Sequence, residues 1–248
     1  RVPPAVASKS IGSLESTQWH TRMVRQALVL NDRVLAETGM SLDPDADAYF
    51  MIQAALVLTP RLGETLGVQR AMGTGFLAQG VISGEGKGRL GAEALMAQHL
   101  LEDMLRNLQR ATDANPAIRT ALEEKARAAQ AQVTKALELA DKELLKVDSP
   151  TYSAPAYFDE FSKTIDMLYA FNNAALDQLR DALQTRADGW SPCLLLVGAT
   201  LALGLVAAVV LALAVIRSIV GPVNTAVRVA GAVAQGDLTV EVPVQGSD

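Results

Sequence analysis

The stretch CLLLVGATLALGLVAAVVLALAVI, residues 193–216, decides the architecture of this chain. It contains no charged residue, and the charge-free segment begins already at Gly189. About 20 apolar residues in a helix suffice to cross the hydrocarbon core of a bilayer. Trp190 stands at the leading edge, where an indole favours the membrane interface, and Arg217 follows the trailing edge. The sequence therefore predicts one transmembrane helix over residues 189–216, in contact with a lipid bilayer.

Composition restricts the rest of the chain to helices. Hydrophobic residues make up 50% of the 248 residues but aromatic residues only 4%, so alanine, leucine and valine dominate, as they do in helices rather than sheets. A net charge of −5 argues against a nucleic-acid partner. The single cysteine, Cys193, excludes a disulfide framework and a cysteine metal cluster.

The segment before the span is predicted to be a series of long helices. Residues 14–38 are helical in pattern, with apolar residues at helical spacing in the second half. A helix over residues 45–79 is expected to start at an Asp43 cap and to kink at Pro60. Breaks are expected at the glycine-rich residues 81–91, at Asn115–Pro116 and at residues 149–155. Each of the three helices that follow these breaks carries one heptad seam of mostly apolar residues. The seams are, in chain order, Leu90, Ala94, Ala97, Leu101, Met104, Leu108 and Ala111; Leu122, Ala126, Ala129, Val133, Ala136, Ala140 and Leu144; and Phe158, Phe161, Ile165, Leu168, Asn172, Ala175 and Leu179. The predicted fold class is all-α: a long antiparallel helical bundle, one transmembrane helix and a coiled-coil helix.

The segment after the span carries a further seam and a recognisable motif. Its apolar residues follow spacings of four and three: Ile216, Val220, Val223, Val227, Ala230 and Ala234. A basic residue at the membrane face, a proline about five residues later, the heptad helix and a Gly-Asp-Leu end resemble the first half of a HAMP linker; the matching residues are Arg217, Pro222, Gly236, Asp237 and Leu238. Since HAMP segments lie in the cytoplasm, the resemblance implies a cytoplasmic segment 217–248 and an extracytoplasmic sensor segment 1–188.

The sensor segment also resembles a known family. Residues 42–80, LDPDADAYFMIQAALVLTPRLGETLGVQRAMGTGFLAQG, and residues 156–171, AYFDEFSKTIDMLYAF, are similar to the external helical region of bacterial methyl-accepting chemotaxis proteins. The resemblance implies a homodimeric chemoreceptor in the bacterial inner membrane, with a periplasmic sensor and downstream cytoplasmic signalling proteins. Its ligand would be a small molecule or a ligand-loaded binding protein. A sensor histidine kinase or cyclase of the same architecture, and a membrane-anchored helical scaffold without a ligand, are the alternatives.

The ends of the sequence lead to a further expectation. The chain begins with Arg1 and stops at Asp248, just where the second HAMP helix would begin. Export of an external sensor needs a targeting segment, so we expect a first membrane helix upstream of Arg1 and a fragment of a longer protein.

No catalytic constellation is present in the sequence, and we expect neither an enzyme nor a metal or cofactor site. His20 and His99 have no second ligand at metal-binding spacing. The acidic run Asp43, Asp45 and Asp47 suits a helix start better than a calcium loop. GEGKG, residues 84–88, lacks the strand and the Gly-Lys-Ser/Thr end of a phosphate loop, and a flexible turn is expected there.

Two polar residues in the predicted seams are candidates for ligand contact. Arg70 lies on the line Leu56, Thr59, Gly63, Leu66, Arg70, Gly73 and Leu77, so its guanidinium is expected to face the bundle and to need a carboxylate or a bound anion. Asn172 lies at an equivalent position in the last helix, where a buried asparagine often fixes register. Tyr49, Tyr169 and Asn173 complete the candidate set. The hypothesis is a small carboxylate or similar anion bound between these helices, with structural pairing of Arg70 as the alternative.

Overall fold

The computed structural model describes residues 13–236, which are helical and contain no strand. The elements in chain order are α2 (Ser13–Glu37), η1 (Met40–Leu42), α3 (Ala46–Ile52), η2 (Gln53–Leu58), α4 (Thr59–Gln79), α5 (Gly84–Ala114), α6 (Pro116–Ala140), η3 (Asp141–Leu145), α7 (Ala154–Val215), η4 (Ile216–Val220) and α8 (Gly221–Ala234). The predicted fold class, an all-α helical bundle followed by one candidate membrane helix and a further helix, is confirmed. The chain divides into two units, residues 1–184 and 185–248. Asp237 and Leu238 of the HAMP motif lie outside the described residues.

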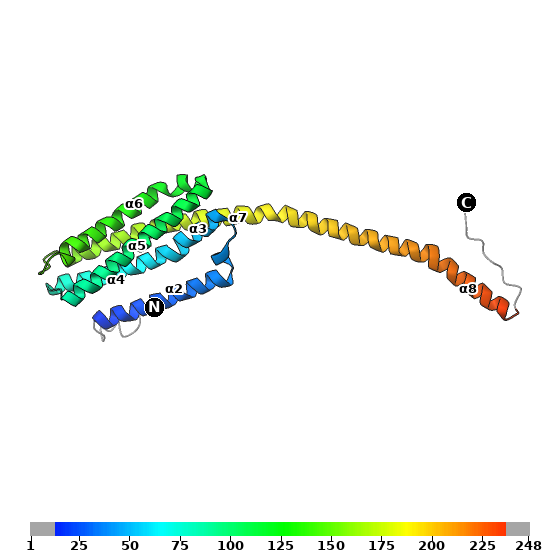
Figure 1. Cartoon of the computed structure of the whole chain (residues 1–248), viewed down its shortest axis with the longest axis horizontal. Helices are drawn as coiled ribbons and strands as arrows, with labels where there is room; N and C mark the ends of the chain where they lie inside the picture. The colour runs from blue at the N-terminus through cyan, green and yellow to red at the C-terminus, as the bar shows by residue number, and fades with distance from the viewer. Residues whose placement is uncertain (1–12, 237–248) are drawn as a thin grey trace. The chain divides into compact units, whose positions relative to one another are not determined.

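In the first unit, α2, α4, α5, α6 and the first part of α7 run alongside one another (Figure 1). The chain passes from α3 to α4 through the π-helical segment η2, which ends just before Pro60. Because proline has no N–H and crowds the preceding turn, the helix changes its hydrogen-bonding pattern where the sequence predicts a kink. Thr59 Oγ1 donates a hydrogen bond to the Ala54 carbonyl at 2.8 Å and satisfies one of the displaced carbonyls.

The break predicted at residues 81–91 is present but shorter, because residues 80–83 are non-helical and the segment is helical from Gly84 onward. α4 ends at Gln79, followed by its C-cap Gly80 with a φ of 69°, and α5 begins at Gly84. Ser83 Oγ caps α5 by accepting a hydrogen bond from the Gly86 N–H at 3.0 Å. GEGKG is therefore the first turn of a helix and not a flexible loop. The predicted cap of α3 is also corrected: the N-cap is Asp45, whose N–H donates to Asp43 Oδ1 at 3.0 Å.

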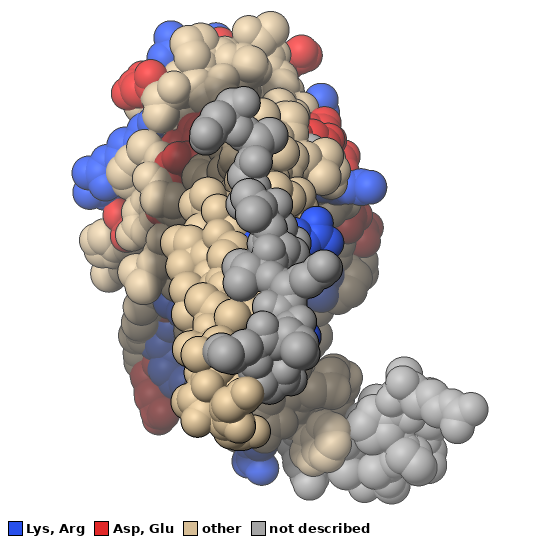
Figure 2. All heavy atoms as spheres, turned by 90° about the vertical axis from the view of Figure 1, so that its right-hand side faces the viewer, with Lys and Arg blue, Asp and Glu red and all other residues tan. Residues whose placement is uncertain are grey.

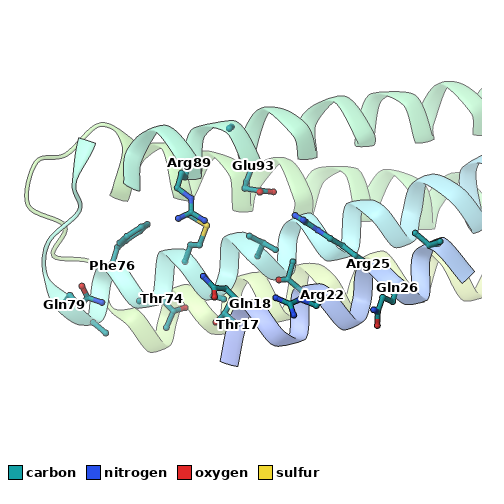
Figure 3. Close-up of a pocket in the computed structure, with 18 residues that line it drawn as sticks. Thr17, Gln18, Arg22, Arg25, Gln26, Thr74, Phe76, Gln79, Arg89 and Glu93 are labelled. Atoms are coloured by element: carbon teal, nitrogen blue, oxygen red, sulfur yellow. The ribbon is translucent and has the colours of Figure 1, made fainter. Parts of the chain in front are cut away.

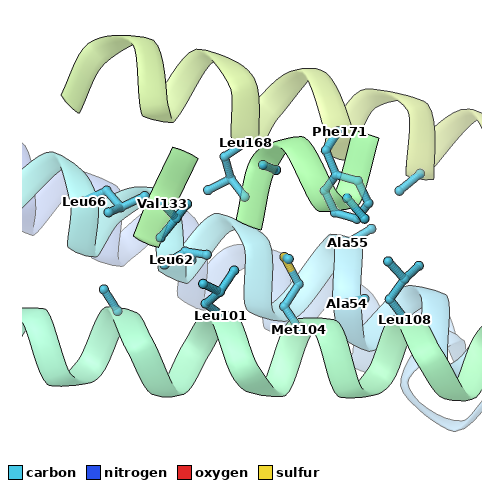
Figure 4. Close-up of a cluster of buried hydrophobic side chains, with 14 of the residues drawn as sticks. Ala54, Ala55, Leu62, Leu66, Leu101, Met104, Leu108, Val133, Leu168 and Phe171 are labelled. Atoms are coloured by element: carbon cyan, nitrogen blue, oxygen red, sulfur yellow. The ribbon is translucent and has the colours of Figure 1, made fainter. Parts of the chain in front are cut away.

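The predicted seams form the core of the bundle. Leu101, Met104 and Leu108 of α5 meet Leu62 and Leu66 of α4, with Val133 of α6 and Leu168 and Phe171 of α7 closing the cluster (Figure 4). All seven residues of the predicted α6 stripe are buried. The α7 seam begins one residue earlier than predicted, because Tyr157 is fully buried whereas Phe158 is 44% exposed.

The second unit consists of the remainder of α7, η4 and α8. Its most apolar 18-residue window has a mean hydropathy of 2.8, and by length and composition this helix can cross a membrane. The apolar side chains of the window are exposed, as lipid-facing residues would be and as core residues of a soluble bundle would not. Arg217 lies in η4, Pro222 in the first turn of α8, and Gly236 has φ 85° just after that helix.

Candidate functional site: an arginine-lined cleft

A cleft of about 1220 Å³ opens between α2, α4 and α5 within the first unit. Its polar wall comes mainly from α2 and α5, and its apolar wall from α4, where Val68, Met72 and Phe76 contribute. Figure 3 shows Arg25 extending from α2, and Arg89 and Glu93 extending from α5, toward the same space. The lining residues of α2 are Thr17, Gln18, Thr21, Arg22, Arg25, Gln26 and Val29.

The cleft carries an excess of positive charge. Its titratable lining consists of Arg22, Arg25 and Arg89 against the single carboxylate of Glu93. None of the three arginines takes part in an ion pair within residues 13–236. A guanidinium presents a planar fork of donors that suits carboxylates and other planar oxyanions. The free donors of the cleft therefore favour an anionic ligand.

Two polar atoms next to this cleft have no hydrogen-bond partner among the described residues. They are the hydroxyl oxygen of Thr74, which lines the cleft, and Glu64 Oε1 behind it. Burial raises the pKa of the Glu64 carboxyl, and Glu93 adds to the rise, while a hydrogen bond with Thr21 and the charge of Arg25 oppose it. Buried polar atoms normally have partners, so the Thr74 hydroxyl and Glu64 Oε1 are exceptions beside the cleft.

Arg70 lies outside this cleft and has partners within the bundle. It is half-buried, its Nη1 donates to Ser162 Oγ at 2.8 Å, and its guanidinium lies over the Phe158 ring at 4.7 Å. The expected carboxylate partner is absent from the part of the chain that the structure describes, because a hydroxyl and an aromatic face take its place. This arrangement favours the structural alternative for Arg70 over ligand contact.

The other sequence candidates also lie outside the cleft. Asn172 is 5% exposed and its Oδ1 has no partner, while Asn173 is exposed. Tyr169 is 39% exposed and packs over Gly63, where an added Cβ would lie 2.8 Å from the tyrosine hydroxyl. Tyr49 is half-buried and packs edge to face on Phe50, with ring centroids 5.2 Å apart. The cleft is therefore built from residues other than these candidates.

The sequence contained one signal for the cleft that the seam analysis did not use. Arg22 and Arg25 stand three residues apart on one helix, with Thr21 beside them, so they share a polar face. Arg89 lay in the segment expected to be a loop, and its helical position could not be anticipated. Within residues 13–236 the structure holds no cluster of three or more potential metal ligands.

Charges of both signs are mixed over the surface visible in Figure 2, without one extended basic patch. This distribution agrees with the net charge of −5 and gives no electrostatic footprint for nucleic acid. His20 and His99 are exposed, and in each ring Nδ1 contacts the backbone carbonyl of the residue four positions earlier.

Comparison with known families supplies the biological context. The family model described as nitrate and nitrite sensing (NIT) matches residues 4–180, and the HAMP domain model matches residues 214–248. No curated protein and no solved structure matches the chain. Together with the candidate span, the two matches indicate a membrane sensor that signals through HAMP, and the two modules are non-catalytic. Since the first match covers more than half of the sequence, the chain belongs to the NIT family of nitrate- and nitrite-sensing domains.

Proposed function

We propose that this chain is the input part of a transmembrane receptor that binds nitrate or nitrite in the cleft between α2, α4 and α5. The observation that carries the proposal is the set of three unpaired arginines, Arg22, Arg25 and Arg89, in one cleft of a NIT-family bundle. Nitrate and nitrite are small planar oxyanions, and the guanidinium fork matches such groups.

The dimensions of the cleft suggest how binding would become a signal. At about 1220 Å³ the cleft is larger than a typical small-molecule pocket, and far larger than a small oxyanion. An anion that bridges arginines of α2 and α5 would therefore favour a narrower cleft. A ligand shifts a conformational equilibrium only by its differential affinity for the two states, and the narrower state gains the additional contacts. Helix displacements of about 1–2 Å are a usual scale for such switching.

Calorimetric titration of the full chain in lipid nanodiscs with nitrate, nitrite and chloride tests the site. Removing one charged hydrogen bond costs about 1.5–3 kcal/mol, so Arg25→Ala and Arg89→Ala should each weaken nitrate binding roughly 10- to 100-fold. Arg33→Ala, on the same helix but paired with Glu37 outside the cleft, is the matched control and should leave the affinity unchanged.

The variant Arg70→Ala distinguishes binding in this cleft from binding at Arg70, the site that the sequence analysis suggested. We expect wild-type nitrate affinity for Arg70→Ala, because its guanidinium is held by Ser162 and Phe158. Loss of binding in Arg70→Ala with unchanged binding in Arg25→Ala and Arg89→Ala would refute the proposed cleft.

We further propose that residues 1–188 are periplasmic, residues 189–216 span the bacterial inner membrane and residues 217–248 are cytoplasmic, and that the receptor is a homodimer. The HAMP match at residues 214–248 supports the orientation, and the resemblance to chemoreceptors supports a chemotaxis output through downstream cytoplasmic proteins. Swimming of cells toward or away from nitrate, with and without the receptor, tests this output. An unchanged nitrate response together with nitrate-dependent phosphorylation by the same polypeptide would assign the receptor to the sensor kinases.

A further inference from the structure

The face of α2 that points away from the bundle carries large apolar side chains in water. On its inner face Leu35 is buried, and Asn31 Nδ2 donates to the Leu56 carbonyl of η2 at 2.7 Å. On the other side Met23, Leu30 and Val34 are 49%, 62% and 49% exposed. At about 100° per residue these three lie more than a quarter turn from Leu35. The helix therefore has one apolar face that the bundle covers and a second that it leaves open.

The spacing of the open face is that of a coiled-coil seam. Met23, Ala27, Leu30 and Val34, which we call the α2 seam, follow one another at intervals of four, three and four. Such spacing matches the side chains of a second long helix, which insert between turns along the whole seam. None of the four residues is charged, so two copies can be placed in register without opposing like charges.

The second unit of the chain carries an unpartnered seam of the same kind. Ile216, Val220, Val223 and Val227 are exposed by 53%, 45%, 53% and 66%, and they follow the same spacing of four, three and four. This seam lies within the HAMP match, and the α2 seam lies within the NIT match. A partner for both seams must supply two long helices, one for each seam. A second copy of this chain meets this requirement, because it carries the same two seams in the same order along its sequence.

We propose that the α2 seam is the surface through which the sensor bundles of two copies associate, parallel and in register. The contact is isologous: each seam residue of one copy meets the same residue of the other, as in two-fold symmetric dimers. The proposal rests on the proposed function only in taking the receptor to be a homodimer. It assigns that dimer to one helix face, which neither family match does.

The α2 seam leaves the arginine cleft accessible. Arg25 lies about 140° around the helix from Leu30, on the side that lines the cleft. One side of α2 thus lines the anion site of its own bundle, and another side contacts the second copy. Any movement of α2 that a bound anion favours changes the packing of the α2 seam directly.

Disulfide cross-linking of the full chain in membranes tests the proposal. In a Cys193→Ser background, which removes the natural cysteine, single cysteines replace Met23, Leu30 or Val29. Val29 is the matched control, because it is adjacent to Leu30 and as exposed, at 67%, but faces the cleft. Because a disulfide needs Cβ atoms about 4 Å apart, Met23→Cys and Leu30→Cys should form linked dimers at least about ten-fold faster than Val29→Cys. Equal rates at Leu30 and Val29, or none at Met23 and Leu30, would overturn the assignment.

A charge in the seam gives a second measurement. Leu30→Glu should lower the dimer fraction of the detergent-solubilised chain by light scattering, while Ala36→Glu, also exposed on α2, should not. An unchanged dimer fraction in Leu30→Glu together with slow cross-linking would rule out the α2 seam. Nitrate titration of the uncross-linked Leu30→Cys chain keeps the two proposals apart: failure to bind nitrate with rapid cross-linking contradicts the anion site and supports the seam.

Discussion

The closest approach between α4 and α7 depends on the absence of a side chain at Gly73. A Cβ added there would lie 2.3 Å from Cε1 and 2.5 Å from the hydroxyl oxygen of Tyr157. The Tyr157 ring is fully buried and stacks on Phe161 with 4.6 Å between ring centroids. Its hydroxyl also donates to the Gln69 carbonyl at 3.4 Å. The ring therefore has no free space into which it can withdraw, and Gly73→Ala should destabilise the bundle.

The size of the effect follows from two opposing contributions. Replacing glycine by alanine inside a helix gains about 1 kcal/mol from backbone propensity. Overpacking a core costs about 1–3 kcal/mol, and contacts as short as those at Gly73 belong at the upper end. The net expectation for Gly73→Ala is a loss of about 2 kcal/mol. Gly67, on the same helix, has nothing within 4 Å of an added Cβ, so Gly67→Ala should gain about 1 kcal/mol.

Thermal unfolding of the bundle, followed by circular dichroism on the full chain in detergent, measures both effects. For a unit of this size about 1 kcal/mol corresponds to about 2–4 °C in Tm. We expect Gly73→Ala to lower the midpoint by roughly 4–8 °C and Gly67→Ala to raise it by roughly 2–4 °C. A Gly73→Ala chain as stable as Gly67→Ala would refute the reasoning. In a Tyr157→Ala background the Gly73→Ala penalty should disappear, which a double-mutant cycle measures.

Three further predictions concern the capping, charge and packing of the same bundle. Ser83→Ala removes the hydrogen bond that the Gly86 N–H donates and should cost about 1 kcal/mol in the unfolding free energy, measured by denaturant titration. Burial raises the pKa of the Glu64 carboxyl, so the protonated carboxyl stabilises the fold below pH 4.5, and this stabilisation is lost as the pH rises through the raised pKa. Glu64→Gln should therefore be more stable than wild type at neutral pH and should lose that advantage below pH 4.5, as measured by paired melting curves. Met104→Ala should cost about 2–5 kcal/mol by opening a cavity at a fully buried position, whereas Leu95→Ala, at 60% exposure, should stay within about 0.5 kcal/mol in the same titration.

The heptad seams predicted the helices and most of the core because burial on a helix repeats every three or four residues. The same reasoning was only partly right at the glycine-rich segment, where the break covers residues 80–83 but residues 84–91 are helical. The structure uses Gly86 for close packing: an added Cβ would lie 3.0 Å from the Phe76 ring. The Ser83 cap starts the helix there despite the poor propensity of its first residues. The tertiary contact at Gly86 outweighs the low helix propensity of glycine, and the spacing of apolar residues in the sequence does not reveal such a contact.

The cleft could not be predicted from periodicity because it depends on which helices are neighbours. Arg22 and Arg25 belong to α2, whereas Arg89 belongs to α5, and only the fold brings them to one opening. The seam position of Arg70 predicted a guanidinium that faces the bundle, and the side chain does turn toward α7. The seam position did not predict that the long side chain would end over the Phe158 ring beside Ser162, where a carboxylate is not needed.

The distribution of burial explains why α2 is suited to be the moving wall of a sensor. Among its described side chains only Leu35 is buried, whereas α5 contributes Leu101, Met104 and Leu108 to a continuous core. The free energy that holds α2 against the bundle is correspondingly small, since it scales with the apolar area removed from water. One or two charged hydrogen bonds to an anion, at about 1.5–3 kcal/mol each, are comparable with that free energy. The same contacts could not displace α5, so a signal that begins in this cleft is expected to act through α2.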